Sequence, residues 1–138
     1  MREILFRGKP INKSDGANSW IEGFYTKSPS GRTRILTTYN ARPIEVIPES
    51  VGQFTGLTDK NGKKIFEGDI LHCIFEDENY IVEWDEIGAG FLFHRINNKK
   101  RTGGIDYYEF EDICGSFGFE VIGNIFDHPH LLEEGVQE

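Results

Sequence analysis

The chain has 138 residues, enough for one domain with a real hydrophobic core, and its formal net charge is −8. Two cysteines are too few for a disulfide scaffold, and no apolar run approaches the roughly 20 residues that span a bilayer. No apolar leader is expected after Met1, so we expect a cytoplasmic protein and not a secreted one. The charge is divided along the chain: residues 1–64 carry eleven Lys/Arg against six Asp/Glu, whereas residues 65–138 carry four against seventeen, and this net acidity is unlike most nucleic-acid binders.

Alternation of apolar and polar residues recurs along the chain, whereas no segment keeps helical spacing for ten or more residues. Residues 1–52 therefore predict a β-rich N-terminal region. Its strands contain few apolar residues, too few for a second core, and Pro43 and Pro48 bracket the last of them, which predicts an open edge. The predicted strands are residues 3–7, 20–26, 34–39 and 44–47.

Residues 53–71 combine a turn signal with the start of a strand. Asn61-Gly62 predicts a two-residue type I′ hairpin turn, because both positions need positive φ. Gly68 and Asp69 then open an apolar run, where an Asp is expected to accept backbone hydrogen bonds that close the turn. We interpret Gly56, Asn61, Gly62, Gly68 and Asp69 as architectural residues.

Residues 53–138 predict a small SH3-like, partly open β-barrel, because short apolar strands with exposed edges invite aggregation. Trp84 is expected to point into the barrel with Tyr80 and Val82, and Gly123 lies on the inward face of the last strand. Residues 127–134 predict one C-terminal helical turn. The N-terminal region and the barrel could also form one continuous domain. The predicted strands are residues 70–75, 80–85, 91–96, 107–113 and 119–126.

Four segments resemble the YopX-like proteins of phages and prophages. They read REILFRG (residues 2–8), QFTGLTDKNGKKIFEGDIL (53–71), VEWD (82–85) and EVIGNIFDHPHLLE (120–133), so the resemblance covers essentially the whole chain. It implies a β fold in the cytoplasm of a bacterial host cell. No activity is established for that family, so the resemblance implies no catalytic or ligand-binding residue.

The residues themselves predict no catalytic, cofactor or metal site. On a strand, Asp69 and Cys73 face away from His72, so one metal ion cannot collect all three side chains. Cys73 is expected to be a small core residue and Cys114 a more exposed one, with no activating His-Asn pair nearby. We therefore expect no enzyme and no cofactor.

Two sets of residues are candidates for binding. The first is the basic cluster of the acidic half, set around a long loop that could contact phosphates or an acidic partner: Arg95, Lys99, Lys100 and Arg101. The second is an aromatic platform, although barrel core accounts equally well for two or three of its members: Trp20, Trp84, Phe91 and Phe93.

Three functional hypotheses follow. The first is a non-enzymatic β module that binds a protein or forms a homo-oligomer, by pairing of basic and acidic halves or of N-terminal edge strands. The second, less favoured, is a nucleic-acid-associated module that uses the basic N-terminal half and the loop of Lys99 to Arg101. The third is a host-directed inhibitor that presents the acidic half as a DNA mimic.

Overall fold

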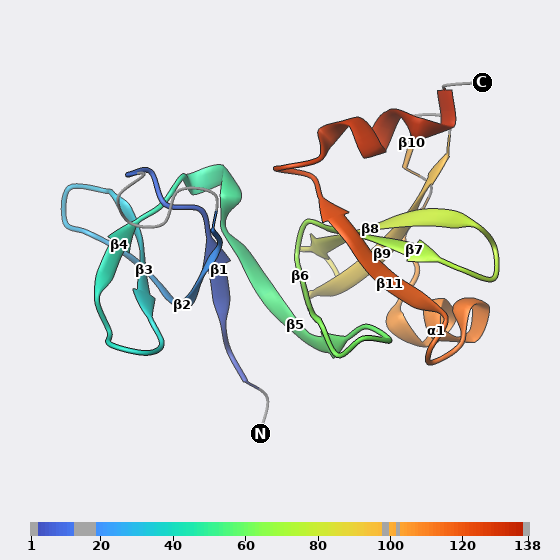
Figure 1. Cartoon of the computed structure of the whole chain (residues 1–138), viewed down its shortest axis with the longest axis horizontal. Helices are drawn as coiled ribbons and strands as arrows, with labels where there is room; N and C mark the ends of the chain where they lie inside the picture. Colours follow the sequence, from blue (N-terminus) through green and yellow to red (C-terminus); the bar gives the residue numbers. More distant parts are fainter. Residues whose placement is uncertain (1–2, 13–18, 98–99, 102, 137–138) are drawn as a thin grey trace. The chain divides into compact units, whose positions relative to one another are not determined.

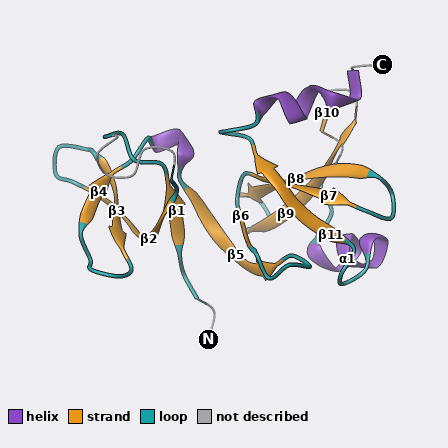
Figure 2. Ribbon diagram, viewed as in Figure 1, coloured by secondary structure: helices purple, strands orange, loops and turns teal. Residues whose placement is uncertain are grey.

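The computed structural model describes residues 3–12, 19–97, 100–101 and 103–136, and its fold is mostly β (Figure 1). Two antiparallel sheets and one short α-helix make up most of the regular structure, as Figure 2 shows. The chain divides into two compact units, Met1–Gly56 and Leu57–Glu138, which we call the N-terminal and C-terminal units. The sequence-based boundary after residue 52 stays a prediction. No helix in the described ranges is long and apolar enough to cross a membrane.

The first sheet has the strand order β4-β3-β2-β1-β5-β6. The four strands predicted before residue 48 are all present, with ends shifted by one to three residues. The sequence predicted the hairpin between β5 and β6 but did not delimit its strands. A short 3-10 helix, Pro48–Ser50, precedes β5. The strands are β1 (Phe6–Gly8), β2 (Ile21–Lys27), β3 (Thr33–Thr37), β4 (Pro43–Glu45), β5 (Gly52–Thr58) and β6 (Lys64–Phe66).

The N-terminal unit buries a core of its own, so the expectation that its strands are too poor in apolar residues is wrong. On β3, Ile35 is fully buried and lies opposite the buried Ile44 of β4. Leu5, Val46 and Phe54 are buried as well. A few apolar residues suffice here because they alternate with polar ones and therefore share one face of the sheet.

The Asn61-Gly62 pair turns the chain between β5 and β6, but not as a type I′ turn. Gly62 has a φ of +78°, whereas Asn61 is not among the described residues with positive φ. The Gly62 N–H donates to the Asp59 carbonyl (3.0 Å), and the Asp59 N–H donates to the Lys63 carbonyl (2.9 Å). Residues 59–62 form this turn, which ends on Gly62 in a left-handed conformation. A three-residue loop that ends on a left-handed residue is a common hairpin connection.

The second sheet has the order β10-β9-β8-β7-β11. The edge strand β10 has only two residues, and the other four strands are longer. On β8, Tyr80 and Val82 belong to one buried cluster and Ile81 to another, so both faces of this strand are covered. The half-exposed alternation predicted for this strand is therefore wrong. The strands are β7 (Asp69–Cys73), β8 (Glu78–Asp85), β9 (Gly90–Asn97), β10 (Lys100–Arg101) and β11 (Phe119–Asn124).

A helix, α1 (Tyr107–Cys114), stands where the sequence predicted a strand. Asp106 caps it by accepting a hydrogen bond from the Glu109 N–H (2.9 Å). Its Phe110 is fully buried and stacks on Phe93 of β9, with ring centroids 4.6 Å apart. The strand prediction is wrong because Tyr108 and Phe110 alternate with acidic residues as they would on a strand, whereas the buried residues Phe110 and Cys114 are spaced four apart, on one face of a helix.

No closed barrel is found in the part of the chain that the structure describes, so the SH3-like barrel is a wrong prediction. The second sheet ends at β10 and β11, and each pairs with a single neighbour. Its apolar faces are covered by other elements: α1 packs on one, and Leu131 of the C-terminal 3-10 helix (Pro129–Val136) packs on the other. The predicted C-terminal helical turn is confirmed in this form.

Candidate functional site

The glycines of residues 53–71 have a left-handed backbone: Gly56 lies within β5, and Gly62 and Gly68 lie in turns. Gly56, Gly62 and Gly68 have φ values of +90°, +78° and +92°, which a residue with a Cβ atom rarely adopts. The Gly68 N–H donates to the Val82 carbonyl (2.8 Å), and the Gly68 carbonyl accepts from the Ile125 N–H (2.9 Å). This turn therefore joins β8 to the end of β11.

Two further motif residues, Asp69 and Gly123, lie in tightly packed positions. The Asp69 side chain is almost fully buried, and its Oδ2 accepts a hydrogen bond from the Phe66 N–H (2.7 Å). A Cβ atom on Gly123 would lie only 2.7 Å from Nδ1 of His128 and 3.1 Å from Leu131. Close approach, rather than a special φ, explains the glycine at 123.

Asp59 is a buried structural carboxylate that the sequence analysis missed. Its Oδ1 accepts from the N–H groups of Asn61 (2.8 Å) and Lys63 (2.9 Å), and its Oδ2 accepts from the Val121 N–H of β11 (2.9 Å). Burial alone would raise the pKa of this carboxyl, but hydrogen bonds from Val121, Lys63 and Asn61 outweigh it and lower the pKa. An Asp two residues before the Asn of a tight turn was the available signal.

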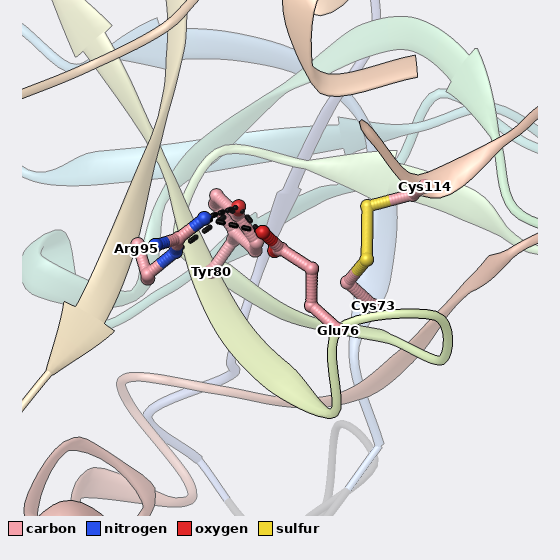
Figure 3. A network of polar contacts seen from close by, with 5 residues as sticks. All are labelled: Cys73, Glu76, Tyr80, Arg95 and Cys114. Atoms are coloured by element: carbon pink, nitrogen blue, oxygen red, sulfur yellow. Dashed lines mark hydrogen bonds and ion pairs between the residues drawn. A yellow bond between two sulfur atoms is a disulfide. The ribbon is translucent and has the colours of Figure 1, made fainter. Parts of the chain in front are cut away.

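Figure 3 shows a side-chain network of the C-terminal unit, formed by Glu76, Tyr80 and Arg95. The Tyr80 hydroxyl donates to Glu76 Oε1 (2.6 Å) and accepts from Arg95 Nε (3.3 Å) and Nη2 (3.1 Å). Arg95 Nη2 also donates to Glu76 Oε2. A half-open pocket of about 120 Å³ lies beside this network, lined by Tyr80, Phe93, Arg95, Gly103, Ile105 and Ile113.

The carboxylate of Glu76 and the guanidinium of Arg95 balance each other's charge in the network. Burial raises the pKa of Tyr80, and the hydrogen bond to Glu76 raises it further, so the phenol keeps its proton near neutral pH. The Arg95 guanidinium is occupied by Glu76 and Tyr80, although the sequence analysis proposed it as a contact for a partner. Elsewhere in the described chain, no group of three His, Cys, Asp or Glu side chains is placed to hold a metal ion.

The other members of the predicted basic cluster are Lys99, Lys100 and Arg101. Lys99 lies outside the described residues. Lys100 and Arg101 form β10, paired with Asn97 and Ile96 of β9. The long loop predicted for residues 97–104 is thus partly a strand extension.

Trp84 lies at the surface, so its predicted burial is wrong. Its exposed fraction is 41%, compared with 1% for Tyr80 and 0% for Val82 on the same strand. The core cluster ends before Trp84, whose ring instead packs edge-on against Phe91 (5.1 Å between centroids). Of the proposed aromatic platform, Phe93 is core.

Trp20 of the N-terminal unit lies between two cations. The Arg7 guanidinium is 4.6 Å, and the Lys9 ammonium 5.1 Å, from the centre of its ring. Arg7 is itself 8% exposed. Such contacts stabilise a cation and an aromatic ring by about 0.5–2 kcal/mol, depending on exposure.

Cys73 and Cys114 form a disulfide, with Cα atoms 5.6 Å apart, which ties the end of β7 to the end of α1 (Figure 3). Both are buried, so the exposed Cys114 expected from the sequence is wrong. No sequence feature indicated the pairing, because 41 residues separate the two cysteines and α1 was expected to be a strand.

Apolar side chains are exposed in a row across the N-terminal unit. Phe24 of β2 lies opposite Leu36 of β3, which lies opposite Pro43 of β4. Residues directly opposite in antiparallel strands point to the same face, and Ile35 and Ile44 occupy the other, buried face. Phe24 is 55% exposed, and Pro43 is exposed as well. We call Phe24, Leu36 and Pro43 the apolar row.

A second set of exposed apolar side chains lies beside the disulfide. Cys73 pairs with Phe119, and the Ile74 N–H donates to the Gly118 carbonyl (2.8 Å), so the β7–β8 turn runs next to the loop after α1. Phe75 and Phe117, at these neighbouring positions, are 84% and 80% exposed, and Ile74 is 46% exposed. We call Ile74, Phe75 and Phe117 the disulfide end.

The comparisons with known proteins settle the family. A model of the YopX protein family matches residues 11–133. The chain belongs to the YopX family. A search of curated proteins finds no match. Among solved structures, this YopX chain is similar to protein EF1440 from Enterococcus faecalis, with a TM-score of 0.51 and 24% identity over 96% of this chain and 100% of that one. At this identity, the likeness shows a shared fold alone.

Proposed function

We propose that this YopX protein is a non-enzymatic module that acts by binding and, in particular, by self-assembly. The observation that carries the proposal is the opposite character of its two units. Residues 1–56 contain eight Lys/Arg and five Asp/Glu, whereas residues 57–138 contain seven against eighteen, so their formal charges are +3 and −11. Each unit also exposes a group of large apolar side chains. Surfaces of opposite charge with apolar centres favour association.

The polar chemistry of the C-terminal unit supports binding over catalysis. The network of Glu76, Tyr80 and Arg95 keeps Tyr80 protonated and engages Arg95 with Glu76, so neither Tyr80 nor Arg95 is poised as a nucleophile or base. The buried Asp59 carboxylate is occupied by three backbone N–H groups. These groups stabilise turns and strand contacts, which suits a scaffold for surfaces.

Light scattering at micromolar concentration tests the proposal. At low salt we expect a mass well above the 15.8 kDa of one chain. The mass should fall as salt rises, because the Debye length shortens from about 30 Å at 0.01 M to about 10 Å at 0.1 M. A mass of 15.8 kDa at low salt would reject self-assembly, and a larger mass that salt does not change would reject the charge pairing.

A second candidate function, association with single-stranded nucleic acid, is favoured by the contacts of Trp20 with Arg7 and Lys9. Aromatic rings beside cations bind bases by stacking and phosphates by charge. Fluorescence anisotropy with a labelled single-stranded DNA would test it. Binding that weakens steeply with salt and is lost in Trp20→Ala would support this function, and absence of binding at low salt would reject it.

A further inference from the structure

We propose that the Cys73–Cys114 disulfide is a redox switch that controls whether α1 stays closed on the core of the C-terminal unit. In the oxidised protein the disulfide holds α1 against the sheet, and reduction by a dithiol lets α1 open. The inference goes beyond the proposed self-assembly and does not depend on it.

The segment that opens lies between two backbone anchors. On one side, Ile105 and Phe93 of β9 exchange two hydrogen bonds, of 2.8 and 3.0 Å. On the other side, the Gly118 carbonyl accepts a hydrogen bond from the Ile74 N–H (2.8 Å). Residues 106–117 lie between these anchors and include the whole of α1, and we call them the α1 segment.

The hydrogen bonds of the α1 segment stay within it or reach only the next turn. The hydroxyls of Tyr107 and Ser116 both donate to Glu111 Oε2, at 3.2 and 3.1 Å. Among the described residues, no hydrogen bond or ion pair joins the α1 segment to a strand. Apolar contacts and the disulfide therefore hold α1 on the sheet, and only the disulfide can be cut by a chemical signal (Figure 3).

The apolar contacts converge on Phe110, which is fully buried. Its ring centroid lies 4.6 Å from that of Phe93 and 4.9 Å from those of Tyr80 and Phe119. These three side chains are buried in the same core cluster. Opening of α1 would uncover them, so it would change the surface of the unit as well as its stability.

Without the disulfide, α1 is a weak helix. It has eight residues, fewer than the roughly 12–15 that an isolated helix needs in water. Glu111 and Asp112 lie in its second half, and its last turn holds no basic residue, so their charges oppose the helix dipole. The disulfide is attached at this same end, through Cys114. Gly115 follows with a φ of +81°, and a residue without a Cβ atom accommodates the backbone rotation that opening requires.

The redox step is an ordinary thiol–disulfide exchange. One thiolate of the dithiol attacks a sulfur and forms a mixed disulfide, and its second thiol then releases the other cysteine. The S–S bond breaks, Cys73 and Cys114 each take up a proton as thiols, and the dithiol is oxidised to its own disulfide. Cys114 keeps an exposed fraction of 6%, and the exposed Gly115 and Ser116 follow it, so the reductant approaches from this side. In a cytoplasm, where we expect the protein from its sequence, disulfides usually act in redox sensing or catalysis.

Hydrogen exchange of the full chain, followed by mass spectrometry with and without dithiothreitol, tests the switch. The quantity measured is the exchange rate of the α1 segment divided by that of β8, which pairs with strands on both sides. Reduction also lowers the stability of the whole unit, but global unfolding speeds exchange of both peptides alike, so the ratio isolates local opening. We expect reduction to raise the ratio by about tenfold or more, and oxidised dithiothreitol to restore the first value.

Three results would overturn the inference. A ratio that reduction leaves unchanged would show that the disulfide stabilises the whole unit evenly. A disulfide that dithiothreitol does not reduce in the folded protein, as counted by thiol labelling, would exclude a switch, and so would a ratio that does not return on reoxidation.

A variant without the disulfide is the matched control. Cys73→Ala combined with Cys114→Ala should show the raised ratio without any reductant and should not respond to dithiothreitol. A response in this variant would place the effect outside the disulfide and would also overturn the inference. If the variant fails to fold, the wild-type comparison still decides, because it needs no substitution.

Discussion

Replacing Asp59 should destabilise the C-terminal unit more than any other single change at its surface turns. The carboxylate of wild-type Asp59 holds the β5–β6 turn through two N–H groups and holds β11 through the Val121 N–H. Asp59→Ala removes all three acceptor contacts. Asp59→Asn keeps one oxygen that accepts hydrogen bonds from the turn. Its NH2 group would face the Val121 N–H and cannot accept the hydrogen bond from it.

The magnitude follows from the position of each donor. The N–H groups of Asn61 and Lys63 lie in an exposed turn, where water replaces the lost acceptor, so each contributes about 0.5–1 kcal/mol. The Val121 N–H lies in a strand beside the core, and its charged hydrogen bond contributes about 1.5–2 kcal/mol. Asp59→Ala should therefore lower the free energy of unfolding by about 3 kcal/mol, and Asp59→Asn by about half as much.

The assay is denaturant unfolding in a Trp20→Phe background, followed by the fluorescence of Trp84, so that the signal comes from the C-terminal unit. Asp77→Asn is the matched control, because its side chain is 91% exposed and its contact with His72 (3.3 Å) is one at the surface, so it should change stability by less than about 0.5 kcal/mol. An Asp59→Ala protein as stable as this control would refute the reasoning.

The same carboxylate should make stability depend on acidic pH. Because the pKa of Asp59 is lower in the folded protein than in the unfolded chain, its contribution is present above about pH 4 and is lost as the pH falls through the folded pKa. Asp59→Asn should lack this loss, so the stability difference between wild type and variant should shrink on acidification. A difference that stays constant down to pH 2 would contradict the assignment.

Three further changes give distinct expectations. Gly68→Val should cost about 1–3 kcal/mol, because a β-branched residue is strained at a φ of +92°, and an unchanged melting temperature would contradict this. Trp84→Ala should cost about 2 kcal/mol or less, below the 3–5 typical of a buried Trp, because the ring is 41% exposed; denaturant unfolding by circular dichroism measures it. Reduction of Cys73–Cys114 should cost about 4 kcal/mol, from the entropy of a loop with 41 residues of separation, and equal unfolding midpoints with and without reductant would exclude it.

The sequence predicted the strands best where alternation and turn residues agree. The prediction placed five strands within a few residues of their bounds: β2, β3, β7, β8 and β9. In these segments both the alternation of apolar residues and the turn residues at the ends indicate a strand. α1 was misassigned because aromatic and β-branched residues at alternate positions mimic a strand. The cap formed by Asp106 and Glu109 was the local signal of a helix.

The candidate site was harder to predict, because it depends on contacts between distant segments. Asp59 reaches Val121 across 62 positions of the sequence, and Cys73 reaches Cys114 only because α1 folds back on the sheet. Trp84 follows the alternation of its strand, but it is exposed because the core ends before it. Periodicity does not indicate where along a strand the core ends. The charge division, by contrast, is a property of the sequence alone, and the proposal of self-assembly rests on it.

Zero-length crosslinking of a mixture of ¹⁴N- and ¹⁵N-labelled protein tests the central claim most directly, because it identifies contacts between copies. A carbodiimide joins a Lys amine to a carboxylate only when the two groups touch. We predict mixed-isotope peptide pairs that join a Lys of the N-terminal unit, such as Lys27, to a carboxylate of the C-terminal unit, such as Asp112. Pairs that carry a single isotope throughout would contradict self-assembly, and mixed pairs that join two N-terminal units would contradict pairing of the basic unit with the acidic one.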